Sequence, residues 1–94
     1  MLAASPTDNF LQHALALEYI KVQEDEKAKL LFENILAVSP GYIGSYYHLA
    51  KLLERNGKKN AAVEWYEKGM QAAKAAGDNH SYNELQSAYE DLIY

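Results

Sequence analysis

The chain has 94 residues, of which 49% are hydrophobic and 23% are charged, and it contains no cysteine. This length and composition fit one folded domain, 1–94, and exclude disulfide and thiolate chemistry. The formal net charge of −4, without a basic run, argues against nucleic acid and anionic membrane surfaces as partners. No segment has the apolar length of a membrane span or the features of a signal peptide, so we expect a cytoplasmic protein.

The first predicted helix has an N-cap at Thr7 or Asp8, where a side-chain oxygen can accept the free N–H groups of the first turn. It extends to about Val22. The apolar face predicted from helical spacing consists of Phe10, Leu11, Ala14, Leu15, Leu17 and Ile20.

The second predicted helix follows a polar break at 23–25 and ends at Ser39, because Pro40 cannot continue a helix. Its predicted apolar face consists of Ala28, Leu31, Phe32, Ile35, Leu36 and Val38.

Three further helices are predicted. The third spans about 43–55 and ends at Asn56-Gly57, and the fourth spans about 58–76 and ends at Gly77. Asp78 is the expected N-cap of the fifth helix. The sequence thus predicts an all-α fold, and loops of two to four residues place consecutive helices antiparallel.

One pattern recurs 34 residues apart. Leu15, Ala16, Ala28, Phe32 and Pro40 correspond to Leu49, Ala50, Ala62, Tyr66 and Lys74, and only the last pair changes its character. Such a period is typical of a helix–turn–helix unit that stacks on copies of itself. Stacked helical repeats usually present surfaces that hold other chains.

These residues resemble the tetratricopeptide repeat (TPR) family. The resemblance implies a short right-handed solenoid of antiparallel helical hairpins, with a first repeat at 9–42, a second at 43–76 and a capping helix at 77–94. Four positions depart from the family pattern: Gln12 replaces an aromatic residue, Leu53 a tyrosine, Gly69 an alanine and Lys74 the final proline.

In such a stack the first helix of each pair lines a concave groove. The residues expected to line it are Phe10, His13, Leu17, Lys21, Tyr47, Lys51, Glu54 and Arg55, with Ser81 and Asn83 from the last helix. Phe10 and Tyr47 would form an aromatic platform, and three cations would orient a bound segment. The alternative for each of these residues is that it is an ordinary surface residue with no role in binding.

The family's best-known ligand mode is a two-carboxylate clamp for the C-terminal tails of heat-shock chaperones, which uses Lys, Asn and Arg side chains. The corresponding positions here are His13, Leu17, His48, Asp78 and Tyr82. None matches, so we expect no binding of chaperone tails through a carboxylate clamp.

Catalytic and metal-binding motifs are not found in the sequence. His13, His48 and His80 are spread over three predicted helices, without the spacing that metal ligands need. There is no nucleophile motif and no glycine-rich phosphate cradle. We therefore expect no cofactor, no metal and no enzymatic activity.

The sequence favours a protein–protein interaction module, a scaffold that binds a peptide or protein of unknown identity. Two alternatives stay open. The chain could be a self-assembly unit that forms a homodimer through exposed apolar residues such as Leu2, Phe10, Leu11, Ile93 and Tyr94, since about three repeats are usually needed for stability. It could also be a regulatory domain of a larger protein.

Overall fold

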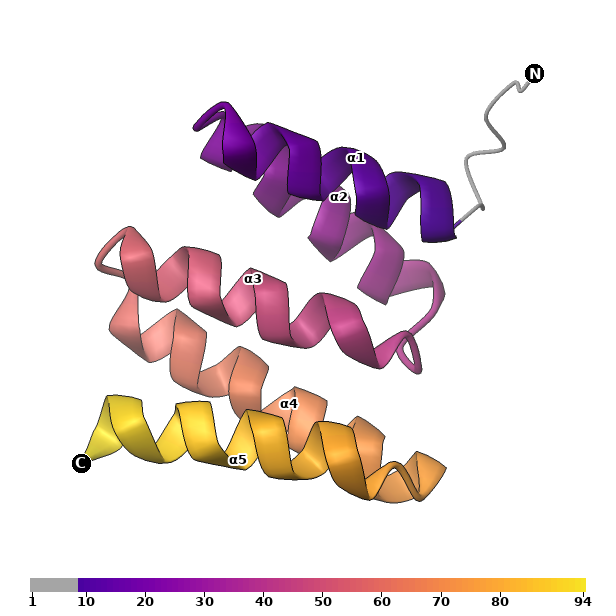
Figure 1. Cartoon of the computed structure of the whole chain (residues 1–94), viewed down its shortest axis with the longest axis vertical. Coiled ribbons are helices and arrows are strands. Elements are labelled where there is room, and N and C mark those ends of the chain that lie inside the picture. Colours follow the sequence, from indigo (N-terminus) through magenta and orange to yellow (C-terminus); the bar gives the residue numbers. More distant parts are fainter. Residues whose placement is uncertain (1–8) are drawn as a thin grey trace.

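The computed structural model describes residues 9–94, which form five α-helices (Figure 1). Their bounds are α1 Asn9–Lys21, α2 Asp25–Val38, α3 Ile43–Arg55, α4 Lys59–Ala76 and α5 Asn79–Ile93. Among the described residues, no helix is both long and apolar enough to cross a membrane. The all-α architecture predicted from the sequence is confirmed.

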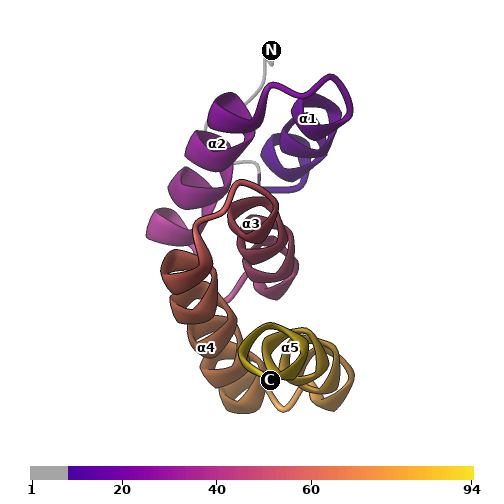
Figure 2. The same cartoon turned by 90° about the vertical axis from the view of Figure 1, so that its left-hand side faces the viewer.

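The helices form a stack of antiparallel hairpins. The pairs α1–α2 and α3–α4 pack closely, and α5 packs on α4. Seen from the side, α1, α3 and α5 lie along one edge of the stack, and α2 and α4 lie along the other (Figure 2). The stack curves toward the first set, so these three helices line its concave face.

The core contains three of the five residue pairs that recur at the 34-residue period. Ala16 and Ala50, Ala28 and Ala62, and Phe32 and Tyr66 all have no exposed surface. Alanine at these buried positions lets two helices approach each other, because its side chain has only one carbon. The core therefore combines small residues, which let the helices approach, with the aromatic rings of Phe32 and Tyr66.

The predicted helix ends are also largely confirmed. Gly57 and Gly77 have φ values of +77° and +71°, a left-handed conformation that favours glycine. Asp78 accepts a hydrogen bond from the backbone N–H of Ser81 at 3.1 Å, as expected of an N-cap. Asp25, predicted to belong to the polar break, is instead the first residue of α2. The N-caps predicted at Thr7 or Asp8 lie outside the described residues.

The apolar face predicted for the first helix is partly wrong. Phe10, Leu11 and Leu15 are 72%, 47% and 46% exposed. The reason is topological, because α1 lies at one end of the stack and no other described helix packs on its outer side (Figure 1). Val38, at the end of α2, is also exposed.

Gly69 allows α4 to pack closely against α3. A Cβ atom at this position would lie 2.7 Å from the Cβ of Tyr46 and 3.1 Å from a methyl carbon of Leu85. The first of these distances is shorter than any van der Waals contact between carbon atoms. The departure from the family's alanine therefore follows from a close contact with Tyr46.

We predict that Gly69→Ala destabilises the fold by about 1–2 kcal/mol, although alanine is the better helix former. The clash with Tyr46 outweighs the gain in helix propensity, because the Cβ of Tyr46 is fixed to its own backbone. The midpoint of thermal unfolding, followed by circular dichroism, should fall by roughly 5–10 °C.

Gly44→Ala is the matched control, because its added Cβ would meet only His13, at 3.8 Å. This variant should be neutral or more stable. Equal effects of the two substitutions would contradict the packing argument.

Candidate functional site

Two hollows lie side by side on the concave face, one on each side of α3. The first, of about 450 Å³, lies between α1 and α3 and is lined by Ile20, His48, Lys51, Leu52, Glu54 and Arg55. The second, of about 430 Å³, lies between α3 and α5 and is lined by Tyr47, Lys51, His80, Asn83, Glu84, Ser87, Ala88 and Asp91. Lys51 belongs to both, so it lies on the ridge between them.

Tyr47 supplies the aromatic surface beside this ridge. Its ring is half-buried and meets the ring of Tyr66 edge-on, with centroids 6.5 Å apart. The Nζ atom of Lys51 lies 5.9 Å from the centroid of the Tyr47 ring, within reach of a cation–π interaction. The packing fixes the ring while one face of the residue lines the second hollow.

Glu54 is held in place by the core beneath it. The hydroxyl of Tyr66 donates a hydrogen bond of 3.0 Å to the Oε1 atom of Glu54. Burial, and then this hydrogen bond, raise the pKa of Tyr66. Glu54 also lies 4.0 Å from Lys51, so its carboxylate partly neutralises the cation on the ridge.

The other two predicted cations are neutralised by carboxylates of the same chain. Lys21 pairs with Glu18 at 3.1 Å on the surface of α1. Arg55 pairs with Asp25, which also accepts a hydrogen bond from Asn56. The hydrogen bond from Arg55 lowers the pKa of Asp25. Arg55 therefore links the end of α3 to the start of α2 as well as lining the first hollow.

His13 packs between the two hairpins instead of facing an open groove. Its Nδ1 atom lies 2.9 Å from the hydroxyl of Ser45 on α3. Its ring meets those of Phe32 and His48 edge-on, with centroids 5.5 and 5.2 Å apart. Burial, and then repulsion from His48, lower the pKa of His13, and burial lowers the pKa of His48.

The structure brings only part of the predicted set together. Tyr47, Lys51, Glu54 and Arg55 line the hollows, whereas Phe10, His13, Leu17 and Lys21 do not. Leu17 packs against the core. Of the two residues expected from α5, Asn83 lines the second hollow, but the hydroxyl of Ser81 donates a hydrogen bond to Asp78.

Sequence reasoning missed the acidic side of the second hollow. Glu84 and Asp91 lie two helical turns apart on α5 and so share one face. This seven-residue spacing could have indicated them. In the described part of the chain, no group of three or more histidine or acidic side chains could hold a metal ion.

The chain is similar to proteins of one family. The sequence profile of the tetratricopeptide repeat family matches residues 43–75. A tetratricopeptide repeat domain protein from Salinibacter ruber, solved by solution NMR, is 36% identical with a TM-score of 0.90, over 95% of this chain and 90% of that one. A crystal structure of such a domain protein from Salinibacter ruber has 36% identity and a TM-score of 0.85, over 90% and 96%.

The crystal structure of MamA has the same fold at 17% identity, with a TM-score of 0.68 over 98% of this chain and 60% of that chain. No curated protein sequence matches the chain. With its fold, its repeat pattern and a relative of 36% identity along nearly its whole length, the protein belongs to the tetratricopeptide repeat family. Proteins of this fold generally mediate protein–protein interaction and are generally not enzymes.

We predict that the folded protein loses stability as the pH falls below about 6.5, the ordinary pKa of histidine. His13 and His48 have lowered pKa values in the fold, so the unfolded chain takes up their protons first. The contribution of these two histidines to stability is complete above the pKa of histidine in the unfolded chain. It declines as the pH falls toward their lowered pKa values in the fold. Urea unfolding at pH 7.5, 6.5 and 5.5 measures this decline as a fall in the free energy of unfolding.

The double variant His13→Gln/His48→Gln should show a flatter dependence on pH over this range. The exposed His80 supplies the matched control, His80→Gln. A double variant with the slope of the wild type would contradict the assignment to these two rings. Asp25 and Asp78, whose pKa values are lowered from ordinary acidic values, lose their contribution only at lower pH.

Proposed function

We propose that the concave face of α1, α3 and α5 binds an extended or helical segment of a partner protein. The observation that carries this proposal is the pair of adjoining hollows that meet at Lys51. The two hollows extend from α1 across α3 to α5, and an extended segment that crosses Lys51 would place side chains in both of them. The division into repeats at 9–42 and 43–76, with a cap at 77–94, belongs to the same proposal.

Affinity in this proposal comes mainly from apolar and aromatic contact. Tyr47 offers a large ring already held by Tyr66 and His48, so little conformational entropy is lost when a partner covers it. Ile20 supplies aliphatic surface in the first hollow, whereas Leu52, which also lines it, is 3% exposed and contributes little. Phe10 and Leu17 extend the apolar contact along α1, beyond the hollows.

Orientation of the bound segment comes from charge. The first hollow carries two cations, Lys51 and Arg55, and one carboxylate, Glu54, whereas the second carries Glu84 and Asp91 on α5 opposite Lys51. A segment with an acidic residue over the first hollow and a basic residue over the second would match this asymmetry. Lys51 is the most available cation, since its distance of 4.0 Å to Glu54 is the longest of the ion pairs. Lys21 and Arg55 act more weakly, because closer carboxylates neutralise them.

We predict that Tyr47→Ala combined with Lys51→Ala weakens binding of a groove ligand by about 100-fold. Short peptides selected against the wild-type protein from a displayed random library serve as probes, and fluorescence anisotropy gives their dissociation constants. Because Tyr47 also packs against the core, its loss lowers stability. Lys51→Ala alone, at an exposed residue, should weaken binding about tenfold without that loss.

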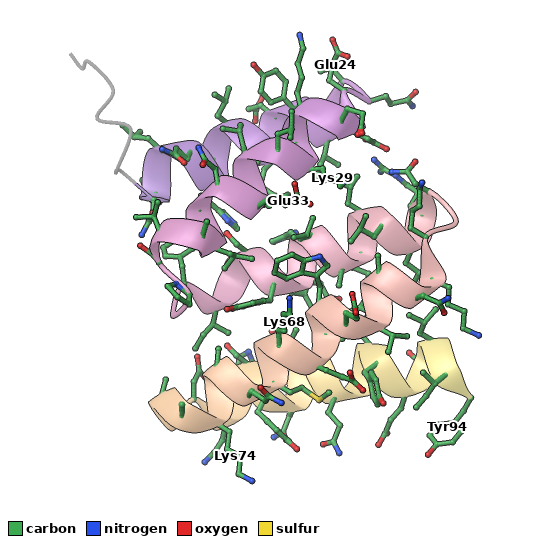
Figure 3. The ribbon with its side chains drawn as sticks, turned by 180° about the vertical axis from the view of Figure 1, so that it is seen from behind. Glu24, Lys29, Glu33, Lys68, Lys74 and Tyr94 are labelled. Carbon is green, nitrogen blue, oxygen red and sulfur yellow. The ribbon has the colours of Figure 1, made fainter. Side chains whose placement is uncertain are left out.

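Lys74→Ala is the matched control. Lys74 is also an exposed lysine, but it belongs to α4, which faces the viewer when the stack is seen from behind (Figure 3). This variant should bind with the wild-type constant. The proposal fails if Lys51→Ala and the double variant bind the selected peptides as tightly as the wild type does. It fails equally if Lys74→Ala weakens binding as much as Lys51→Ala does.

A further inference from the structure

His48 lines the first hollow with a ring whose nitrogen atoms have no partner in the described chain. The ring forms no hydrogen bond within residues 9–94, whereas the neighbouring His13 is hydrogen-bonded to Ser45. No buried side-chain nitrogen or oxygen atom of the described residues lacks such a bond, so the ring nitrogens of His48 are not buried. They are therefore accessible to a group that enters the hollow.

Three neighbouring rings fix the orientation of His48. The ring of Phe32 on α2 lies parallel to it, with centroids 6.2 Å apart. The rings of His13 on α1 and Tyr47 on α3 meet it edge-on, with centroids 5.2 and 5.7 Å away. Because the ring is already held, little conformational entropy is lost when one of its nitrogens binds a partner atom.

The charges around His48 favour an anion in the first hollow. The titratable and charged groups that face the ring or share its hollow are His13 on α1, Tyr47, Lys51, Glu54 and Arg55 on α3, and Glu84 on α5. From α2, the uncharged ring of Phe32 faces it. Among the described residues that line this hollow, Glu54 has the only carboxylate, and it already accepts a hydrogen bond from Tyr66. An incoming carboxylate therefore meets two cations and the imidazole ring.

The ring of His48 is mostly uncharged at neutral pH while the hollow is empty. Burial lowers the pKa of His48, and the negative charge of Glu84 offsets this effect only in part. A further carboxylate beside the ring would favour the charged imidazolium, because an opposite charge nearby stabilises the protonated form. Entry of an anion would therefore be accompanied by uptake of a proton.

We propose that His48 takes up a proton from solvent when an acidic side chain of the partner segment enters the first hollow, and that the imidazolium donates a hydrogen bond to this carboxylate. The inference rests on the proposed function, since it concerns the same groove. It specifies the partner as a segment with an Asp or Glu side chain at this point. It also makes binding depend on pH near neutrality, where histidine titrates.

Binding should become tighter as the pH falls, because the complex holds more protons than the separate molecules. Peptides with a central Glu and otherwise random sequence, selected from a displayed library against the wild-type protein, serve as probes. Fluorescence anisotropy should give a dissociation constant about threefold lower at pH 6.0 than at pH 7.5. Loss of folded protein in acid would raise the apparent constant, so it cannot imitate this result.

Two changes should each remove the pH dependence. His48→Gln keeps a hydrogen-bonding side chain that does not titrate. Replacement of the central Glu of the peptide by Gln leaves the protein unchanged, so its effect cannot come from altered folding. In the wild type, the proton affinity of the His48 ring, measured by NMR titration, should rise about tenfold with the Glu peptide and stay constant with the Gln peptide.

The outcomes distinguish failure of this inference from failure of the proposed function. The inference is overturned if peptides that depend on Lys51 bind equally well at both pH values, or more weakly at pH 6.0. It is also overturned if the pH dependence persists in His48→Gln or with the Gln peptide. In these cases the groove itself still binds. If no selected peptide is weakened by Lys51→Ala, the proposed function fails and the inference fails with it.

Discussion

Close approach between helices at four alanines is the constraint on which the rest of this structure depends. Ala16, Ala28, Ala50 and Ala62 have no exposed surface, and larger side chains there would push the paired helices apart. The small residues bring the two helices of each hairpin together, while Phe32 and Tyr66 fill the space that remains. This arrangement places α1, α3 and α5 along one edge, so the concave face follows from packing in the core (Figure 2).

The sequence is sufficient to predict what depends on local chemistry and on the repeat. The left-handed turns at Gly57 and Gly77, and the cap at Asp78, follow from the conformations those residue types favour. The burial of equivalent alanines follows from their period. The sequence does not reveal that Leu15 and Leu49 differ in exposure. Periodicity gives the apolar face of a helix, but it does not show whether a neighbouring helix covers that face. The requirement for Gly69 arises from a contact with another helix, which no local pattern encodes.

The candidate site also combines features that follow from repeat position with features that depend on contacts between helices. Tyr47, Lys51, Glu54 and Arg55, which repeat position placed on the concave face, line its two hollows. Repeat position did not indicate that Arg55 pairs with Asp25, 30 residues earlier, because this contact depends on the angle between α2 and α3. Nor did it show that His13 is enclosed between two hairpins, where its neighbours are Phe32, Ser45 and His48. Packing thus converts several expected ligand contacts into contacts that hold the stack together.

The central claim is that the packing of the hairpins creates a concave face that binds a partner segment. The most direct measurement is an NMR titration of the isotopically labelled chain with a selected peptide, followed through the backbone amides. The account predicts shifts at the amides of α3 near Lys51 and of α5 near Glu84 and Asp91, with little change along the exposed side of α4. Shifts confined to α2 and α4, with α3 and α5 unchanged, would contradict it.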